Sequence, residues 1–171
     1  MKKIIGLVLS ALIIVSCGKE KKTDSEQETL EVSGDKFTLE IEGIYEKDDS
    51  LIVFYENEGF FVHDKPTSVK VKGSPLNQKI IVDMPKNIFP SNFKITVSTN
   101  KDQKNLLISN VTIKNGKLLI DGSNDKYSKL FATDESFSWD EKNSRFTLNH
   151  SNKYPPSFIG TKELIGLLAT E

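Results

Sequence analysis

Cysteine and histidine are almost absent from this chain of 171 residues, which has one cysteine, Cys17, and two histidines, His63 and His150. A disulfide needs two thiols, so the fold must hold by packing alone. No Gly-x-Ser-x-Gly sequence occurs, and the pairing of a nucleophile with histidine that acyl-transfer enzymes use has few candidates here. We therefore expect a protein without enzymatic activity.

An excess of one charge is also lacking, since 23 basic residues face 24 acidic ones and the net charge is −1. Proteins that bind nucleic acids through phosphate groups need a basic surface, so no nucleic-acid partner is expected.

The sequence also lacks a clear pattern of metal ligands. His63 and Asp64 have no second histidine or cysteine at ligand spacing. Residues 121–125 (DGSND) alternate oxygen side chains as calcium loops do, but Lys126 and Ala132 occupy the places of the loop glycine and the bidentate glutamate. We expect a polar turn there, and no metal or cofactor.

The longest apolar run, residues 4–15, is short of the roughly 20 residues that span a bilayer and follows Lys2 and Lys3. This is the pattern of a signal peptide, residues 1–16. The sequence Ile14-Val15-Ser16-Cys17 resembles a lipobox, which predicts that Cys17 is lipidated and anchors the protein in a membrane. The alternative is an ordinary secretory signal peptide that happens to contain a cysteine.

Residues 17–35 are rich in Lys, Glu, Ser and Thr and have little to bury, so we expect a flexible tether. As a random coil it would hold the domain on the order of 20 Å from the membrane. Gly18-Lys19-Glu20 partly matches a lipoprotein export signal. An outer-membrane location is expected, with the periplasmic face and the cell surface both open.

From residue 36 onward, apolar residues alternate with polar ones, the pattern of half-buried strands. The alternation is clearest at Phe37, Leu39 and Ile41 and recurs in later segments, at Val69/Val71, Ile80/Val82 and Phe93/Ile95/Val97. Many short strands separated by turn residues predict an all-β domain over residues 36–171, an antiparallel, jelly-roll-like β-sandwich.

Two local patterns add detail to this domain. Asn115-Gly116 predicts a two-residue type I′ turn with positive φ at both residues. In the tail, Thr161 as a cap and Leu164, Leu167 and Leu168 fit a short helix, and a closing strand fits nearly as well.

Four segments carry a resemblance to a known family: residues 69–73 (VKVKG), 78–85 (QKIIVDMP), 93–98 (FKITVS) and 108–113 (ISNVTI). In order and pattern they resemble the galactose-binding or carbohydrate-binding β-sandwich modules of Bacteroidota lipoproteins. The resemblance implies a jelly-roll fold and a glycan ligand. Members commonly have Arg-x-Asp in the third strand, where this chain has Lys94-Ile95-Thr96, so the polar contact made there is expected to be absent.

Aromatic residues are the candidate ligand contacts, because sugar rings stack on the faces of Trp and Tyr. Tyr154 lies in a proline-containing stretch that predicts an exposed loop. Trp139, two residues after Phe137 on one strand face, fits the core better than an exposed platform. Of the adjacent Phe60 and Phe61, one should be exposed.

These patterns together predict a lipid-anchored, non-catalytic accessory protein of the outer membrane, with a carbohydrate as the leading ligand. The alternative is a structural or interaction lipoprotein that docks on a membrane-protein complex.

Overall fold

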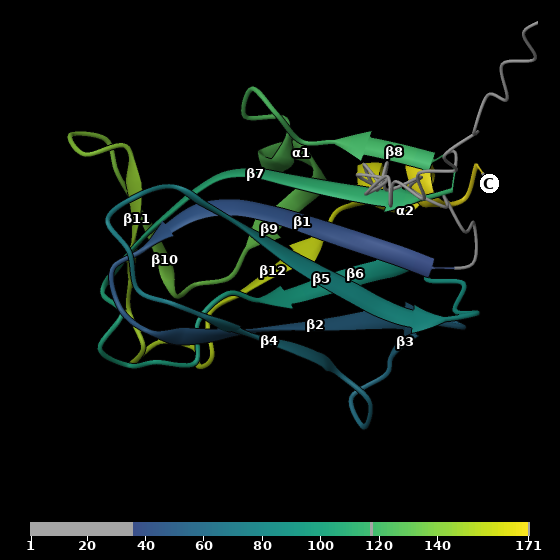
Figure 1. The fold of residues 1–171 in the computed structure, drawn as a ribbon, viewed down its shortest axis with the longest axis horizontal. Coiled ribbons are helices and arrows are strands. Elements are labelled where there is room, and N and C mark those ends of the chain that lie inside the picture. Colours follow the sequence, from purple (N-terminus) through teal and green to yellow (C-terminus); the bar gives the residue numbers. More distant parts are fainter. Residues whose placement is uncertain (1–35, 117, 171) are drawn as a thin grey trace, which may run out of the picture. The chain divides into compact units, whose positions relative to one another are not determined.

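The computed structural model describes residues 36–116 and 118–170, so the predicted signal peptide (1–16), Cys17 and the predicted tether (17–35) lie outside the described residues. The described residues form two sheets in which every strand pair is antiparallel (Figure 1). This confirms the all-β sandwich predicted from the alternating pattern.

The first sheet has the strand order β10-β11-β7-β1-β5, and β8 also pairs with β7. Its strands are β1 (Lys36–Tyr45), β5 (Gln78–Lys86), β7 (Asn105–Asn115), β8 (Leu118–Asp121), β10 (Phe137–Asp140) and β11 (Arg145–Leu148).

The second sheet has the order β3-β2-β6-β12-β9, and β4 also pairs with β2. Its strands are β2 (Asp49–Asn57), β3 (Phe60–Phe61), β4 (Thr67–Val71), β6 (Asn92–Thr96), β9 (Phe131–Thr133) and β12 (Ser157–Gly160). Two short helices are α1 (Tyr127–Leu130) and α2 (Lys162–Leu168). Within the described ranges, no helix is long and apolar enough to cross a membrane.

The core lies between the two sheets and follows the alternation in the sequence. Phe93 and Ile95 of the second sheet and Val97, which follows β6, are fully buried, and Leu39 and Ile41 are buried from the first sheet. The neighbouring Lys94 points to the outer face, where its ammonium lies 5.6 Å from the ring centre of Phe54. The strand faces predicted for these segments are confirmed.

Strand β5 is an edge of the first sheet, which explains how it can contain Pro85 without breaking a ladder of hydrogen bonds.

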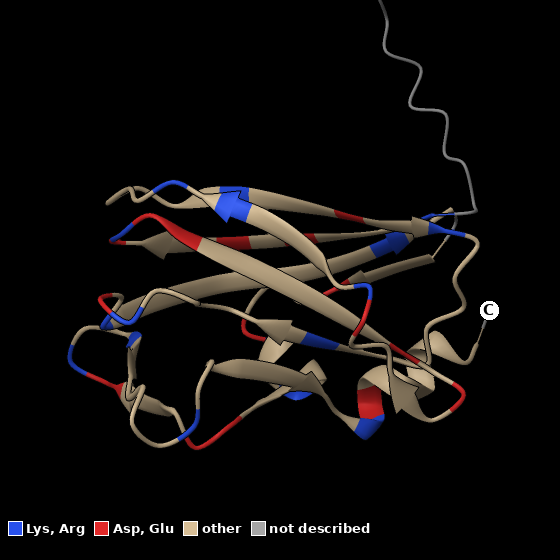
Figure 2. Cartoon of the chain, turned by 90° about the horizontal axis from the view of Figure 1, so that it is seen from below, with Lys and Arg blue, Asp and Glu red and all other residues tan. Residues whose placement is uncertain are grey.

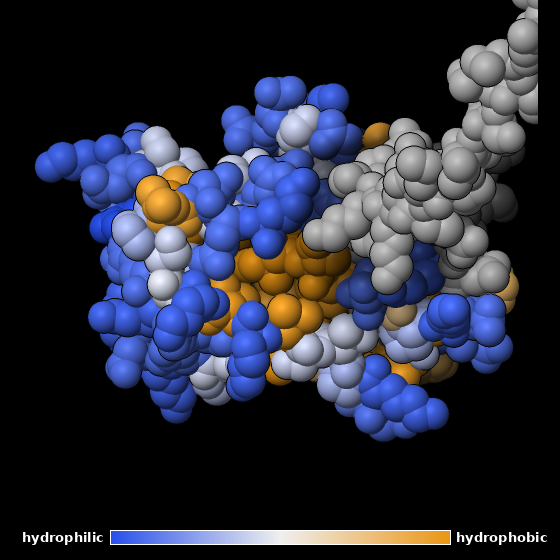
Figure 3. Space-filling model, in the orientation of Figure 1, coloured by the Kyte–Doolittle hydropathy of each residue, from blue (hydrophilic) through white to orange (hydrophobic). Residues whose placement is uncertain are grey.

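Figure 3 shows apolar side chains gathered in the middle of the molecule, in the region that β5 crosses in Figure 1, with hydrophilic side chains around them. Ile81, in the middle of β5, is exposed, whereas its neighbours Ile80 and Val82 are buried. The charged Lys79 and Asp83 flank this apolar stretch and discourage pairing with another chain.

A β-bulge interrupts the pairing of β1 with β7. Glu42 pairs with Asn110, but the next residue, Gly43, pairs with Ile108, so Ser109 has no partner of its own. A β-carbon at Gly43 would collide with the carbonyl oxygen of Leu107, so glycine is required at this point. Because of the extra residue, both halves of β7 bury their apolar residues: Leu106 and Ile108 before the bulge, Val111 and Ile113 after it.

The predicted hairpin at Asn115-Gly116 is present, but its turn lies one residue further along. Asn115 still pairs with Leu118 as the last residue of β7, and Gly116, with φ +52°, begins the connection. Positive φ at both central residues occurs instead between β2 and β3, at Glu58 and Gly59. The prediction of the Asn115-Gly116 turn was therefore wrong in register; the observed register pairs the buried Ile113 with the buried Ile120.

The tail forms helix α2 and not a closing strand. Leu164 and Leu168 are buried one turn apart, whereas Leu167 is exposed. Thr161 stands at the N-cap, but its hydroxyl donates to the carbonyl oxygen of Lys129 (2.6 Å) and not to the helix. The hydroxyl therefore joins α2 to the end of α1.

Charged residues of both signs are interspersed over the strands and loops (Figure 2). On the outer face of the first sheet, the carboxylate of Glu40 bridges Lys114 (2.6 Å) and Lys79 (3.1 Å), which belong to the strands on either side of β1. The hydrogen bond from Lys114 is the main reason why the pKa of Glu40 lies below its ordinary value.

Replacing Glu40 with Gln should lower the free energy of unfolding at neutral pH by about 1 kcal/mol, since both lysines are half exposed and solvent weakens the pairs. Because the pKa of Glu40 is lower in the folded than in the unfolded protein, its ionised form stabilises the fold. This contribution to the free energy of unfolding is complete above the unfolded pKa of 4.5 and is lost as the pH falls through the folded pKa. The difference in the free energy of unfolding between wild type and Glu40→Gln, measured by urea unfolding, should thus shrink below pH 4.5. An unchanged difference in the free energy of unfolding at pH 2.5 would contradict this prediction. An equal loss of free energy at neutral pH in the exposed control Glu141→Gln would contradict it as well.

Candidate functional site

Trp139 lies in the β10–β11 hairpin and has 53% of its surface exposed. The interpretation of this residue as part of the core was therefore wrong. Phe137, on the same face of β10, is partly buried against the core, so the burial that the pattern predicted holds at the start of the strand and is lost two residues later.

The reason is the position of β10 at the edge of the first sheet. One row of paired residues runs across the sheet through Tyr45, Leu106, Phe146 and Trp139. Tyr45 and Leu106 are fully buried, Phe146 is partly buried and Trp139 is exposed. Burial falls steadily toward the edge because no further strand continues the row in the described residues.

The indole of Trp139 is the outermost member of an aromatic cluster. Its ring centre lies 5.1 Å from that of Phe146 in an edge-to-face arrangement, and Phe146 in turn lies 5.9 Å from Phe158. Phe137 packs against both, at 5.4 Å from Phe146 and 5.1 Å from Phe158. Such contacts stabilise ring orientations by roughly 0.5–1.5 kcal/mol per pair, so Trp139 is held on a fixed support.

A cleft of about 360 Å³ opens between α1, β9, β11 and β12 next to this cluster. Phe146 belongs both to the cleft wall and to the contact with Trp139. The side chains that line the cleft are mostly aromatic or small: Tyr127, Ser128, Phe131, Ala132, Thr133, Phe146 and Phe158. We call the cleft together with Trp139 the Trp139 cleft.

The polar groups at the Trp139 cleft are hydroxyls. Burial, and to a smaller extent the nearby charge of Asp125, raises the pKa of Tyr127 to about 12, so its hydroxyl stays protonated at neutral pH. The hydroxyl of Ser128 donates to the carbonyl oxygen of Asp125 (2.7 Å) and keeps its lone pairs free to accept. The described residues that line the cleft include no charged side chain, so it suits an uncharged ligand with an apolar face and hydroxyl groups.

The charged residues within the two strands of the hairpin, Asp140 and Arg145, lie on its other face, because consecutive residues of a strand point to opposite sides. Asp140 accepts a hydrogen bond from the amide of Asn143 (2.6 Å), and Arg145 pairs with Glu46 at the end of β1 (3.0 Å). These contacts fix the hairpin turn and attach it to β1. They contribute to the position of Trp139 without reaching the cleft.

Tyr154, the other predicted ligand contact, lies in an irregular loop and is 44% exposed. Its hydroxyl donates to the carbonyl oxygen of Thr99 (2.6 Å). The ammonium of Lys101 lies 4.8 Å from its ring centre, and the ring of His150 meets it edge to face at 5.7 Å. These contacts hold the ring in place and cover part of it, so Tyr154 presents a smaller free face than Trp139.

Asp121 and His63, which were considered as metal ligands from the sequence, make contacts that support the local structure. The carboxylate of Asp121 accepts from the amide and hydroxyl of Ser123, within a polar turn of the predicted kind. His63 is exposed, with its ring 5.2 Å from that of Phe54. Within the described ranges, no group of three or more His, Cys, Asp or Glu side chains is arranged to hold a metal ion.

Sequence reasoning missed the members of the cleft that come from α1, β9 and β12. Phe146 of β11 was not predicted either, and the four residues of helix α1 carry too little pattern to be detected from sequence. Which strands meet across the sandwich depends on long-range pairing, which a single sequence does not show.

No protein-family model matches the chain, and no curated protein and no solved structure is significantly similar to it.

Proposed function

We propose that this protein is a non-catalytic binding lipoprotein, anchored in the outer membrane through Cys17, and that its sandwich binds a carbohydrate at the Trp139 cleft. The observation that carries the carbohydrate proposal is the exposed indole of Trp139, held edge to face on Phe146 beside a cleft with hydroxyls and no charge. A sugar ring offers an apolar face to an aromatic ring and hydroxyls to its surroundings, so the cleft and the ligand class match.

The lipid anchor rests on the sequence alone, on the lipobox-like Ile14-Val15-Ser16-Cys17. The resemblance to galactose-binding modules supports the same ligand class. Tyr154 is the second candidate contact, in a loop near Thr99 and Lys101.

The carbohydrate proposal is tested by replacing Trp139 with Ala. Loss of the stacked ring should weaken binding to a polysaccharide by about tenfold, or roughly 1.4 kcal/mol. Because the indole is half exposed, the free energy of unfolding should change by only about 1 kcal/mol, less than the ~3–5 kcal/mol typical of a buried aromatic residue. Calorimetry against a panel of soluble polysaccharides and urea unfolding measure the two effects.

Tyr154→Ala is the matched variant, since it removes an aromatic ring of similar exposure. A larger loss of affinity in Tyr154→Ala than in Trp139→Ala would move the site to the Tyr154 loop. In the wild type, the emission of Trp139, the only tryptophan, should be that of an exposed indole and should shift to the blue when a glycan binds.

A protein partner is the second candidate function, because the aromatic walls of the cleft would also accept an apolar side chain of another protein. If the wild type gives no heat with any polysaccharide in the panel, the carbohydrate proposal is wrong. Capture of a membrane protein by wild type and not by Trp139→Ala would then assign the cleft to that partner.

A further inference from the structure

Exposed apolar side chains gather at the end of the sandwich where β1 begins. Phe89, in the loop between β5 and β6, is 84% exposed, and Phe60, next to the β2–β3 turn, is 79% exposed. Ile165, on α2, is also exposed. Figure 1 shows the start of β1, the ends of β2 and β5, and α2 at this same end. We call Phe60, Phe89 and Ile165 the Lys36-end surface.

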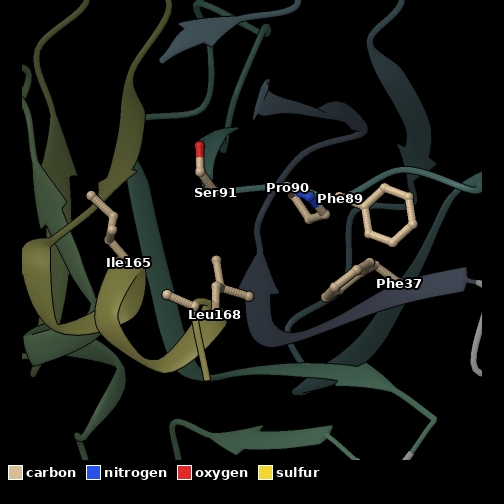
Figure 4. A pocket seen from close by; sticks show the side chains of 7 residues that line it. Phe37, Phe89, Pro90, Ser91, Ile165 and Leu168 are labelled. Carbon is tan, nitrogen blue, oxygen red and sulfur yellow. The ribbon is translucent and has the colours of Figure 1, made fainter. Parts of the chain in front are cut away.

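A shallow apolar cleft of about 290 Å³ lies within this surface (Figure 4). Its lining comes from β1, the β5–β6 loop and α2, and consists of Phe37, Phe89, Pro90, Ser91, Ile165, Leu168 and Ala169. Phe37 is therefore shared between the cleft and the second residue of β1.

The loop that carries Phe89 is tied to the strand that leads to Phe60. The amide of Ser91 donates to the carbonyl oxygen of Glu56 (3.0 Å), and its hydroxyl donates to the Glu56 carboxylate (3.1 Å). These bonds hold the β5–β6 loop against β2, the strand that leads into the turn before Phe60, so both phenyl rings are carried at one end of the molecule. Two exposed aromatic residues held in this way mark a contact with an apolar phase.

The chain outside the structure indicates what that phase is. Residues 17–35 join the domain at Lys36, so under the proposed function the segment that leads to the lipid on Cys17 leaves from this end. The random coil that the sequence predicts for these residues would span on the order of 20 Å, which is less than the roughly 30 Å length of the ten-residue strand β1. The Lys36 end is thus the part of the domain that stays nearest to the bilayer.

Among the described residues at this end, charge does not supply the attraction. Exposed Lys86 and Lys162 at this end are balanced by exposed Glu58 and Glu163. Any binding to a membrane must come from the burial of aromatic and aliphatic surface, at roughly 25 cal/mol per Å², and should depend little on salt.

We propose that the Lys36-end surface rests on the lipid bilayer, with Phe60 and Phe89 placed in the interface between headgroups and acyl chains; this rests on the lipid anchor of the proposed function. Trp139 is paired, through Phe146 and Leu106, with Tyr45 at the far end of β1. The sandwich therefore stands on the membrane with Trp139 about 30 Å along β1 from the bilayer.

The test uses tryptophan as a depth probe in vesicles whose phosphatidylcholine carries brominated acyl chains, which quench only nearby indoles. In a Trp139→Phe background, Phe89→Trp places the single indole on the Lys36-end surface. Leu76→Trp places it in the exposed β4–β5 loop at the other end and is the matched control. The full chain is expressed, purified from membranes and reconstituted, and mass spectrometry of the Cys17 peptide reports acylation.

If mass spectrometry finds no acyl chains on Cys17, the lipid anchor of the proposed function is refuted. The same thiol, the only one in the chain, is then coupled to a maleimide-bearing lipid, so that the membrane contact is still tested.

We expect the emission of the Phe89→Trp protein to fall about twofold in brominated relative to ordinary vesicles, in low and in high salt, as for an interfacial side chain. The Leu76→Trp protein and native Trp139 should be unaffected. Equal emission of Phe89→Trp in the two kinds of vesicle would overturn the proposal, as would equal quenching of Leu76→Trp. Blue-shifted emission of Phe89→Trp before vesicles are added would overturn it too, because another part of the chain or a second copy would then cover the surface.

Discussion

Replacing Ile95 with Asp should abolish the cooperative unfolding transition of the domain at 25 °C. Ile95 is fully buried in the centre of β6, opposite Val53 of β2 and Phe158 of β12. A carboxyl group at this place has no hydrogen-bond partner and leaves a packed core, which costs more than about 4 kcal/mol, a large part of the 5–15 kcal/mol that stabilises a typical domain. Circular dichroism during urea and heat denaturation measures the effect.

Lys94→Asp is the matched control, since it introduces the same residue one position away on the outer face of the same strand. Its loss is limited to the contact of the ammonium with the Phe54 ring, worth about 0.5–1 kcal/mol. Similar midpoints for the two variants would show that β6 does not bury the face assigned to it.

Replacing Cys17 with Ala should remove all membrane attachment that depends on acyl chains. Each buried CH₂ of an acyl chain contributes about 0.8 kcal/mol, so the loss of the chains changes partitioning by many orders of magnitude. Labelling of cells with radioactive palmitate, followed by fractionation, should give a labelled membrane protein for wild type and an unlabelled one for Cys17→Ala.

Ser16→Ala is the control for this experiment, because it keeps the thiol and a small residue before it. It should be labelled as strongly as wild type. Palmitate incorporated into Cys17→Ala would show that the acyl chain is attached elsewhere and would refute the lipoprotein proposal.

The sequence was sufficient to predict the strands whose two faces differ strongly in polarity. Alternation at Phe37, Leu39 and Ile41 and at Phe93, Ile95 and Val97 fixes the core face of β1 and β6 locally, because one face of each strand is buried along its length. Helix α2 was one of two alternatives, and the burial of Leu164 and Leu168 one turn apart decides for it.

The candidate site was only partly predictable. Trp139 was placed on the correct strand face, but its exposure follows from the position of β10 at the edge of the first sheet, and this is a property of the assembled sandwich. The cleft beside it combines Phe146 with Phe158 and Tyr127, which belong to three separate parts of the chain. Periodicity identifies the face of each strand and does not identify its neighbours.

The bulge in β7 has a consequence for the side on which Trp139 is displayed. Pairing with β11 uses the first half of β7, and pairing with β8 uses the second half, so Ser109 lies between the parts of β7 that hold these two neighbours. If the same sequence paired with β1 without the bulge, the side chains of the first half, and with them those of the β10–β11 hairpin, would turn to the opposite face of the sheet. Trp139 would then point away from its cleft, so the bulge, as much as the presence of the tryptophan, determines on which side the ring is displayed.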